Sequence, residues 1–278
     1  MENTQHHKVL FRSTAYKAIR RGYVDTPEGQ IHYWTAGSGP ALLLVHQSSS
    51  SGEEYAGLVP YLADHYQLIA YDWLGHGNSD DPDFPPGVEV YGKGGEAVLL
   101  HLGIDKFSIL GHHGGALVSM NLAYKYPQRV EKVILSGTSG LKPPEETKKF
   151  LANLEEKKTQ ALKRDGQALF SAWGRFVDYL PEASPKEVLR PFMNYIMSQI
   201  RPYDAHYGVL SWDRRPALEG LECPVLLIQG LQDSYVSHQE NLLEIIPNAQ
   251  RKVIKNGGAF LFFDKVKECS EMIREFLG

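Results

Sequence analysis

The feature that most constrains this chain is a glycine-rich segment at residues 111–115, with the sequence GHHGG. It follows an apolar run at residues 107–110 and precedes an apolar stretch of helical character at residues 116–123. Small residues on both sides of His113 indicate a backbone that reverses tightly, because bulky neighbours would clash there. The segment therefore predicts a buried strand that turns sharply into a helix, with His113 at the tip of the turn.

Short apolar runs alternate with helical patterns along most of the chain. Runs typical of strands buried on both faces lie at residues 41–45, 67–71, 107–110, 133–135 and 224–228. Helical patterns lie at residues 53–63, 94–102, 116–126, 239–246 and 265–277. This alternation predicts an α/β fold with a mostly parallel, doubly wound sheet. Ligands of such sheets bind beyond the carboxyl ends of the strands.

The alternation stops between about Pro143 and Pro216, where the pattern is helical and rich in aromatic residues. Residues 184–187, SPKE, match a capping box with proline at the first helical position. We expect residues 1–142 and 217–278 to form the core and residues 143–216 to form an inserted helical cap. Most aromatic side chains of the cap should serve packing, and Trp173 and His206 are candidates to line a pocket.

Composition excludes several classes of partner. The formal net charge of -4 leaves no basic footprint, so we do not expect a nucleic-acid partner. No apolar run is long enough to span a membrane, and the N-terminal residues lack the apolar core of a signal peptide. Cys223 and Cys269 have no metal-ligand spacing and indicate thiols in a reducing compartment. We expect a cytoplasmic protein with a small-molecule substrate or ligand, and the oligomeric state stays open.

The motifs and their order resemble those of the α/β-hydrolase superfamily, in its capped, single-domain form. The matching segments cover nearly all of the chain: LVH at 44–46, DWLGHGNS at 72–79, GHHGG at 111–115, GLQD at 230–233 and GGAF at 257–260. The resemblance implies an α/β-hydrolase fold with a nucleophile elbow at residues 111–115. It also implies a catalytic order of serine, then an acid, then histidine.

Two of these three catalytic positions depart from the family. His113 stands where the family carries serine, Ala259 stands where it carries histidine, and Asp233 keeps the acid. An oxyanion hole needs backbone N–H groups rather than side chains, and by family position these come from Ser48 and Gly114. The neighbours of these positions are further pocket candidates: His46, Gln47 and His112.

His113 is itself a candidate to replace the missing imidazole. Ala259 leaves space between the elbow and the acid, so one ring nitrogen would bind Asp233 while the other faces the pocket. Such a pair suits a general base or nucleophile acting on a small, largely apolar carbonyl or ester-type substrate, in hydrolase-like, lyase-like or other cofactor-free chemistry. We expect no metal, because the neighbouring His112 and His113 point in different directions on a tight turn. We also expect no cofactor.

Two alternatives stay open. In one, the chain is a ligand-binding protein that keeps the pocket and has lost turnover. In the other, it is a hydrolase-family enzyme inactivated by deliberate replacement of a histidine at position 259. Retention of Asp233 together with the elbow glycines favours an enzyme with a non-standard triad.

Overall fold

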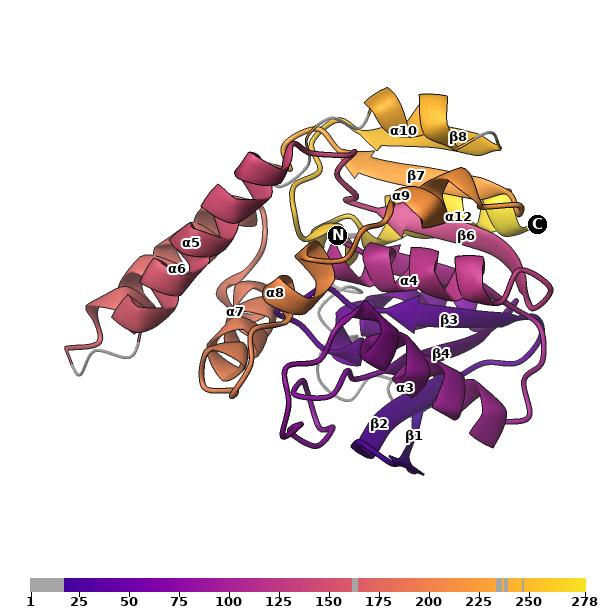
Figure 1. The fold of residues 1–278 in the computed structure, drawn as a ribbon, viewed down its shortest axis with the longest axis horizontal. Coiled ribbons are helices and arrows are strands. Elements are labelled where there is room, and N and C mark those ends of the chain that lie inside the picture. The colour runs from indigo at the N-terminus through magenta and orange to yellow at the C-terminus, as the bar shows by residue number, and fades with distance from the viewer. Residues whose placement is uncertain (1–17, 162–164, 234–236, 238–239, 247) are drawn as a thin grey trace, which may run out of the picture.

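The computed structural model describes residues 18–278, except residues 162–164, 234–236, 238–239 and 247. The N-terminal segment, in which the sequence predicts no signal peptide, lies outside this part. Within it, eight strands form one sheet in the order β1-β2-β4-β3-β5-β6-β7-β8 (Figure 1). The strands are β1 (Arg20–Thr26), β2 (Gly29–Ala36), β3 (Ala41–Val45), β4 (Gln67–Tyr71), β5 (Phe107–His112), β6 (Val130–Ser136), β7 (Val225–Gly230) and β8 (Ala249–Ile254). Strand β2 pairs antiparallel with β1 and β4, and the other pairs are parallel.

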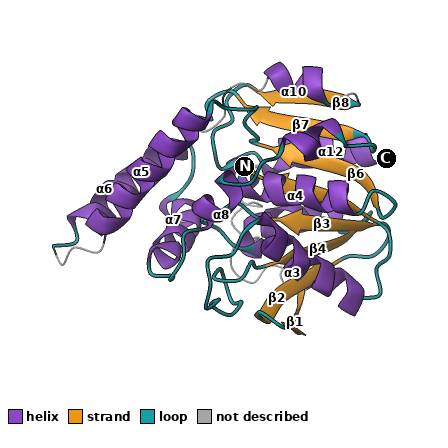
Figure 2. Cartoon of the chain, viewed as in Figure 1, coloured by secondary structure: helices purple, strands orange, loops and turns teal. Residues whose placement is uncertain are grey.

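Helices cover both faces of the sheet (Figure 2). One face carries α3 (Val88–His101), α4 (Gly114–Lys125), α9 (Arg215–Glu219) and α10 (Glu240–Ile245). The other carries η2 (Gly52–Leu58), α2 (Val59–Leu62), α11 (Leu261–Asp264) and α12 (Val266–Leu277). Between β6 and β7 lie α5 (Pro144–Ala161), α6 (Gln167–Tyr179), α7 (Pro185–Gln199) and α8 (Ala205–Leu210). Figure 1 shows α5 and α6 extending away from the sheet.

The predicted α/β class and the mostly parallel, doubly wound sheet are confirmed. Strands β3 and β4 have the bounds that their apolar runs predict, because every residue of β3 and nearly every residue of β4 is buried. Successive β3 side chains enter opposite layers, with Leu43 in one core cluster and Leu42 and Leu44 in the other. The helical patterns at residues 116–126 and 265–277 likewise correspond to α4 and α12.

Strands β1, β2 and β8 are absent from the prediction. β1, with the sequence RRGYVDT, alternates between exposed and half-buried side chains, and β8, with the sequence AQRKVI, is a charged edge strand. An edge strand has one unpaired side and needs no continuous apolar run, so the pattern that finds buried strands does not find it.

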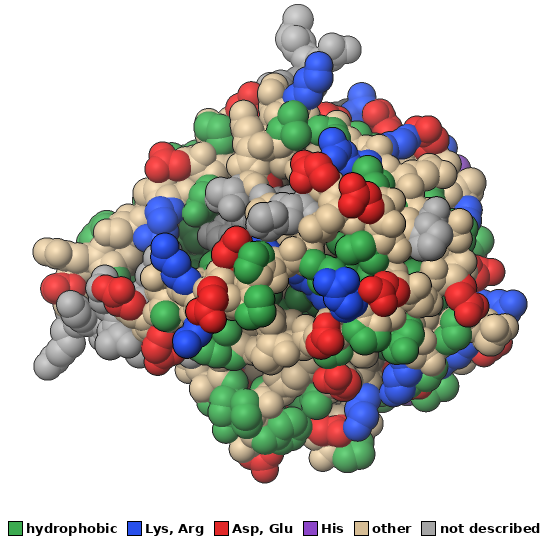
Figure 3. Space-filling model, turned by 45° about the horizontal axis from the view of Figure 1, so that its top comes forward, with side chains coloured by type: hydrophobic (Ala, Val, Ile, Leu, Met, Phe, Trp, Pro, Cys, Tyr) green, Lys and Arg blue, Asp and Glu red, His purple; other side chains and the backbone are tan. Residues whose placement is uncertain are grey.

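Charges of both signs are interspersed on the face of the molecule drawn in Figure 3, which carries no single-sign patch. Among the described residues, none of the helices combines the length and the apolarity that crossing a membrane requires.

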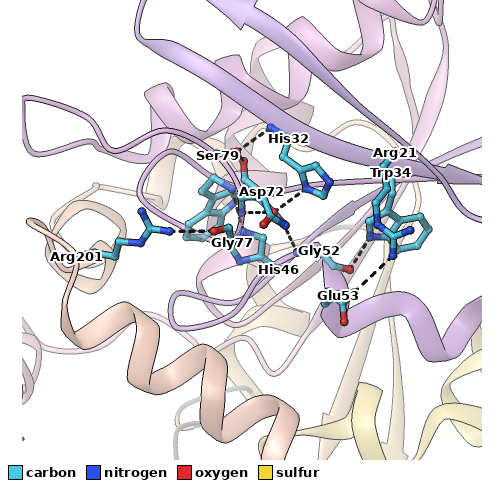
Figure 4. Close-up of polar contacts among 12 residues, drawn as sticks. Arg21, His32, Trp34, His46, Gly52, Glu53, Asp72, Gly77, Ser79 and Arg201 are labelled. Atoms are coloured by element: carbon cyan, nitrogen blue, oxygen red, sulfur yellow. Dashed lines mark hydrogen bonds and ion pairs between the residues drawn. The ribbon is translucent and has the colours of Figure 1, made fainter. Parts of the chain in front are cut away.

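A buried carboxylate, Asp72, ties together the loops behind the sheet's carboxyl edge (Figure 4). Its oxygens accept hydrogen bonds from the N–H groups of Gly52 at 2.7 Å and Asn78 at 2.8 Å, and His32 Nδ1 lies 2.8 Å away. Burial alone would raise the pKa of this carboxyl, but the hydrogen bonds and the nearby histidines bring the pKa below its ordinary value. A charged Asp72 therefore joins β2 to the turns at residues 52 and 78.

We predict that Asp72→Ala lowers the free energy of unfolding by about 3–5 kcal/mol, because it leaves buried donors without an acceptor. Urea unfolding monitored by fluorescence measures this change. The control is Asp81→Ala, which removes an ion pair between Arg201 and the Asp81 carboxylate, which is about half exposed. This variant should lower the free energy of unfolding by about 1 kcal/mol or less. Equal costs for the two variants would contradict the bridging role of Asp72.

Candidate active site

His113 occupies a left-handed backbone conformation between β5 and α4, with φ 46° and ψ -111°. Its N–H donates to the carbonyl of Ser136 at 2.9 Å. A side chain at Gly111 would place its Cβ 2.2 Å from the carbonyl oxygen of Gly115, and one at Gly115 would lie 2.0 Å from that of Val45. The glycines of the elbow are therefore required by the close packing of α4 on β3 and β5.

The side chain of His113 binds Asp233. Its Nε2 lies 2.7 Å from Asp233 Oδ2, so the hydrogen bond predicted from the sequence is present. The imidazole is 15% exposed and the carboxylate is fully buried. When Nε2–H donates to the carboxylate, Nδ1 of the neutral ring carries the lone pair that accepts a proton. The arrangement is a histidine oriented by a buried acid.

Gly137, directly after β6, creates the space that the imidazole needs. A Cβ at this position would lie 2.2 Å from His113 Cδ2 and 2.4 Å from Nε2. Its φ of +60° also disfavours any side chain. The sequence analysis missed this role, although a glycine shortly after the strand predicted at residues 133–135 was a visible signal.

Ala259, at the family's histidine position, is buried on the loop before α11. Its neighbour Phe260 lines a small cavity together with His113. The close neighbours that the structure shows for the imidazole include Gly137 and the ring of His112, whose centroid lies 4.2 Å away. The idea that the ring uses volume left by Ala259 therefore stays a prediction.

The two residues assigned to the oxyanion hole, Ser48 and Gly114, are neighbours in space. A Cβ at Gly114 would lie 3.4 Å from the Ser48 nitrogen and 2.2 Å from its Oγ, and both residues line the larger cavity described below. No described residue accepts a hydrogen bond from either N–H group. The carbonyl oxygen of Ser48 lies 2.8 Å from Nε2 of the His76 side chain. The oxyanion hole predicted at these two residues stays a prediction.

A second buried acid, Glu54, binds the loop that carries Gln47 and Ser48. Its carboxylate accepts hydrogen bonds from the Gln47 N–H and side-chain amide, each at 3.1 Å, and from Nδ1 of His112. Burial would raise the pKa of Glu54, but His112 and Gln47 bring the pKa below its ordinary value. Burial and the adjacent His113 lower the pKa of His112, so its imidazole is neutral. The pair is thus a carboxylate and a neutral imidazole donor.

The sequence analysis did not single out Glu54. The available signal was its spacing, because Glu54, Leu58 and Leu62 fall on one stripe of the predicted helix. A lone acid on an apolar stripe marks either a buried ion or an exposed edge of the stripe, and the sequence alone does not separate the two.

Two cavities meet at His113. The larger, of about 650 Å³, also includes Ser48, Gly114 and Gly137, and the smaller, of about 120 Å³, is lined by aromatic side chains of α6 and α7. Of the pocket candidates, Gln47 and His206 line both cavities. His206 Nδ1 lies 2.7 Å from Asp204 Oδ1.

The other pocket candidates lie elsewhere among the described residues. His46 is fully buried and accepts a hydrogen bond from the Trp73 N–H at 3.0 Å. Burial lowers the pKa of His46, which is consistent with a neutral imidazole that accepts this bond. His112 binds Glu54, and Trp173 packs edge-on against Phe192 with ring centroids 5.2 Å apart. Over the described parts of the chain, no three His, Cys, Asp or Glu side chains are grouped to hold a metal ion.

We predict that Gly137→Ala displaces the His113 ring and breaks its bond to Asp233, because the new methyl group would overlap the imidazole. The variant should also lose about 1 kcal/mol or more of stability through its left-handed backbone. A crystal structure or histidine-selective NMR spectra would show the displacement. The control is Gly174→Ala on α6, where an added Cβ meets nothing within 4 Å. An unchanged imidazole in the Gly137 variant would refute this steric account.

We predict that stability falls as the pH drops below 6.5. Histidines of the unfolded chain take up protons there, whereas His112 stays neutral in the fold because its pKa is lowered. Each such histidine contributes a slope of up to about 1.4 kcal/mol per pH unit. Urea unfolding between pH 7 and pH 5 should give a smaller slope for His112→Asn. Identical slopes in the wild-type protein and the His112 variant would contradict the assignment.

Comparisons with known proteins identify the fold family of this chain. A family model described as alpha/beta hydrolase fold matches residues 40–266. A 2-hydroxy-6-oxo-6-phenylhexa-2,4-dienoate hydrolase of Burkholderia cepacia is 26% identical over 287 aligned positions, which cover 96% of this chain and 98% of that protein. A 3-oxoadipate enol-lactonase of Acinetobacter baylyi is 27% identical over 230 positions, covering 81% and 85%. The crystal structure of a hydrolase from Pseudomonas aeruginosa has a TM-score of 0.79 at 22% identity and covers 93% of this chain and 98% of that one. The chain belongs to the α/β-hydrolase fold family.

Proposed function

We propose that this protein is a hydrolase that opens a small ester or lactone with water, using His113 as the general base. The observation that carries the proposal is the 2.7 Å bond between His113 and Asp233 beside two backbone N–H donors. A base held by a buried acid next to an oxyanion hole contains the groups needed for acyl transfer to water.

The steps follow from the positions of these groups. The substrate carbonyl oxygen binds the N–H groups of Ser48 and Gly114. A water molecule attacks the carbonyl carbon as His113 Nδ1 accepts its proton, and the negative charge collects on the bound oxygen. The carbon–oxygen bond to the leaving group then breaks, and the imidazolium returns the proton to the leaving oxygen. Asp233 keeps the ring oriented and stabilises its charged form.

A good leaving group is favoured, because direct attack by water forms no acyl-enzyme to divide the barrier into two steps. Enol esters and enol lactones, which release an enolate, meet this requirement. The name of one relative points the same way, since it is an enol-lactonase. This name supports the proposal without extending that substrate to this chain.

The helices between β6 and β7 complete the proposed site as a cap. Phe150 of α5 and His206 of α8 contribute to both cavities around His113. A volume of about 650 Å³ suits a small molecule. Covering the site excludes bulk water, which strengthens the interactions of the oxyanion donors.

We predict that His113→Asn lowers kcat/KM for small enol esters and lactones by about 100-fold or more, since it removes the base. Asp233→Asn should also lower kcat/KM, and the exposed His101→Asn variant should retain wild-type values. A serine-directed phosphonate should leave the enzyme active and unlabelled. Steady-state kinetics and intact-mass spectrometry measure these outcomes.

Three results would replace this proposal with a specific alternative. Phosphonate labelling within residues 48–51 would indicate a serine nucleophile. A trapped acyl group on His113 would make the imidazole a nucleophile rather than a base. Ligand binding without turnover of any ester, lactone or carbonyl compound would favour the binding-protein function.

A further inference from the structure

Two basic side chains line the larger of the two cavities at His113. They come from loops that carry neither His113 nor Asp233. Lys142 precedes α5 and Arg214 precedes α9, and both are half-buried. The other charged residues of the cavity lining, Glu146, Lys149 and Asp213, are exposed. The charge carried inside the cavity by side chains other than the His113–Asp233 pair is therefore positive.

Arg214 has no counter-ion among the residues that the structure describes. Its Nη2 donates to the carbonyl of Gly140, and no described carboxylate lies within ion-pair distance of its guanidinium. Other arginines of the described chain do pair with carboxylates: Arg129, Arg190, Arg201 and Arg215. Partly burying a cation whose partner is a single carbonyl costs free energy, and an anionic ligand would offset that cost.

Lys142 is close enough to Arg214 for the two positive charges to interact. Burial and the charge of Arg214 lower the pKa of Lys142, whereas Glu146 and Asp233 raise it. Lys142 is therefore close enough to interact both with Arg214 and with the acid that orients His113. The loop is also anchored, because the Gly140 N–H donates to the Ser237 carbonyl at 2.8 Å.

We infer that Arg214, assisted by Lys142, forms a carboxylate-binding subsite in the cavity of His113. A guanidinium offers five N–H donors in a planar fork that matches a carboxylate, and the Gly140 carbonyl engages only one of its nitrogens. The substrate then carries a carboxylate apart from its reactive carbonyl. This inference rests on the proposed function in one respect, namely that the bound molecule is the substrate of His113.

The test compares binding of phenylacetate with binding of phenylacetamide, which has the same shape without the charge. Ligand-observed NMR titration should show about tenfold tighter binding of the acid to the wild-type protein, as expected for a charge-assisted hydrogen-bonded pair. Arg214→Gln should reduce this preference to about twofold or less, and Arg214→Lys should keep part of it. The neighbouring Arg215→Gln, which removes an exposed ion pair with Glu219, should keep all of it.

Equal affinity for acid and amide in the wild-type protein would overturn the inference, as would a folded Arg214→Gln variant that still prefers the acid. Thermal unfolding of each variant shows whether it is folded. If Arg214→Gln does not fold, the preference of Arg214→Lys for the acid over the amide is compared with that of the wild-type protein instead. The titration needs no turnover, so His113→Asn should retain the preference. A preference for the acid in a protein without hydrolase activity would refute the proposed function alone. Hydrolysis of neutral esters without the preference would refute the subsite alone.

Discussion

The left-handed backbone at His113 is the constraint on which the site depends. It turns β5 into α4 so closely that no side chain fits at Gly111 or Gly115. The same turn brings the N–H of Gly114 beside Ser48 and directs the imidazole over Gly137 to Asp233. The positions of the imidazole and of the backbone N–H group of Gly114 therefore follow from a single backbone conformation.

Buried carboxylates hold the surrounding loops in a similar way. Asp72 binds backbone N–H groups behind the sheet edge, and Glu54 binds the loop that carries Ser48. Each carboxylate has its pKa brought below the ordinary value by its donors despite burial, so each stays charged. Fixed charges at these points resist movement of the loops, because any displacement would leave a buried ion without its partners.

The sequence predicts the interior of this protein better than its edges. Buried strands such as β3 need an apolar residue at every position, which makes them visible, whereas the edge strands β1 and β8 satisfy their environment with polar residues. In the site, the elbow and Asp233 occupy recognisable positions in a motif order. The roles of Gly137 and Arg214 depend on contacts between segments far apart in the chain, with the ring of His113 and with the carbonyl of Gly140. The glycine that follows β6 is visible in the sequence, but no local pattern identifies the distant partner of either residue.

The position of His113 between two unequal cavities has a consequence for substrate selection. Gln47, Phe150 and His206 also belong to both cavities, so the spaces are adjoining rather than independent. A molecule held across the imidazole would place its longer part in the space of about 650 Å³ and its shorter part in the space of about 120 Å³. The smaller, aromatic cavity would then limit the length of the substrate on one side of the imidazole. The larger cavity would accept groups of more varied length on the other side.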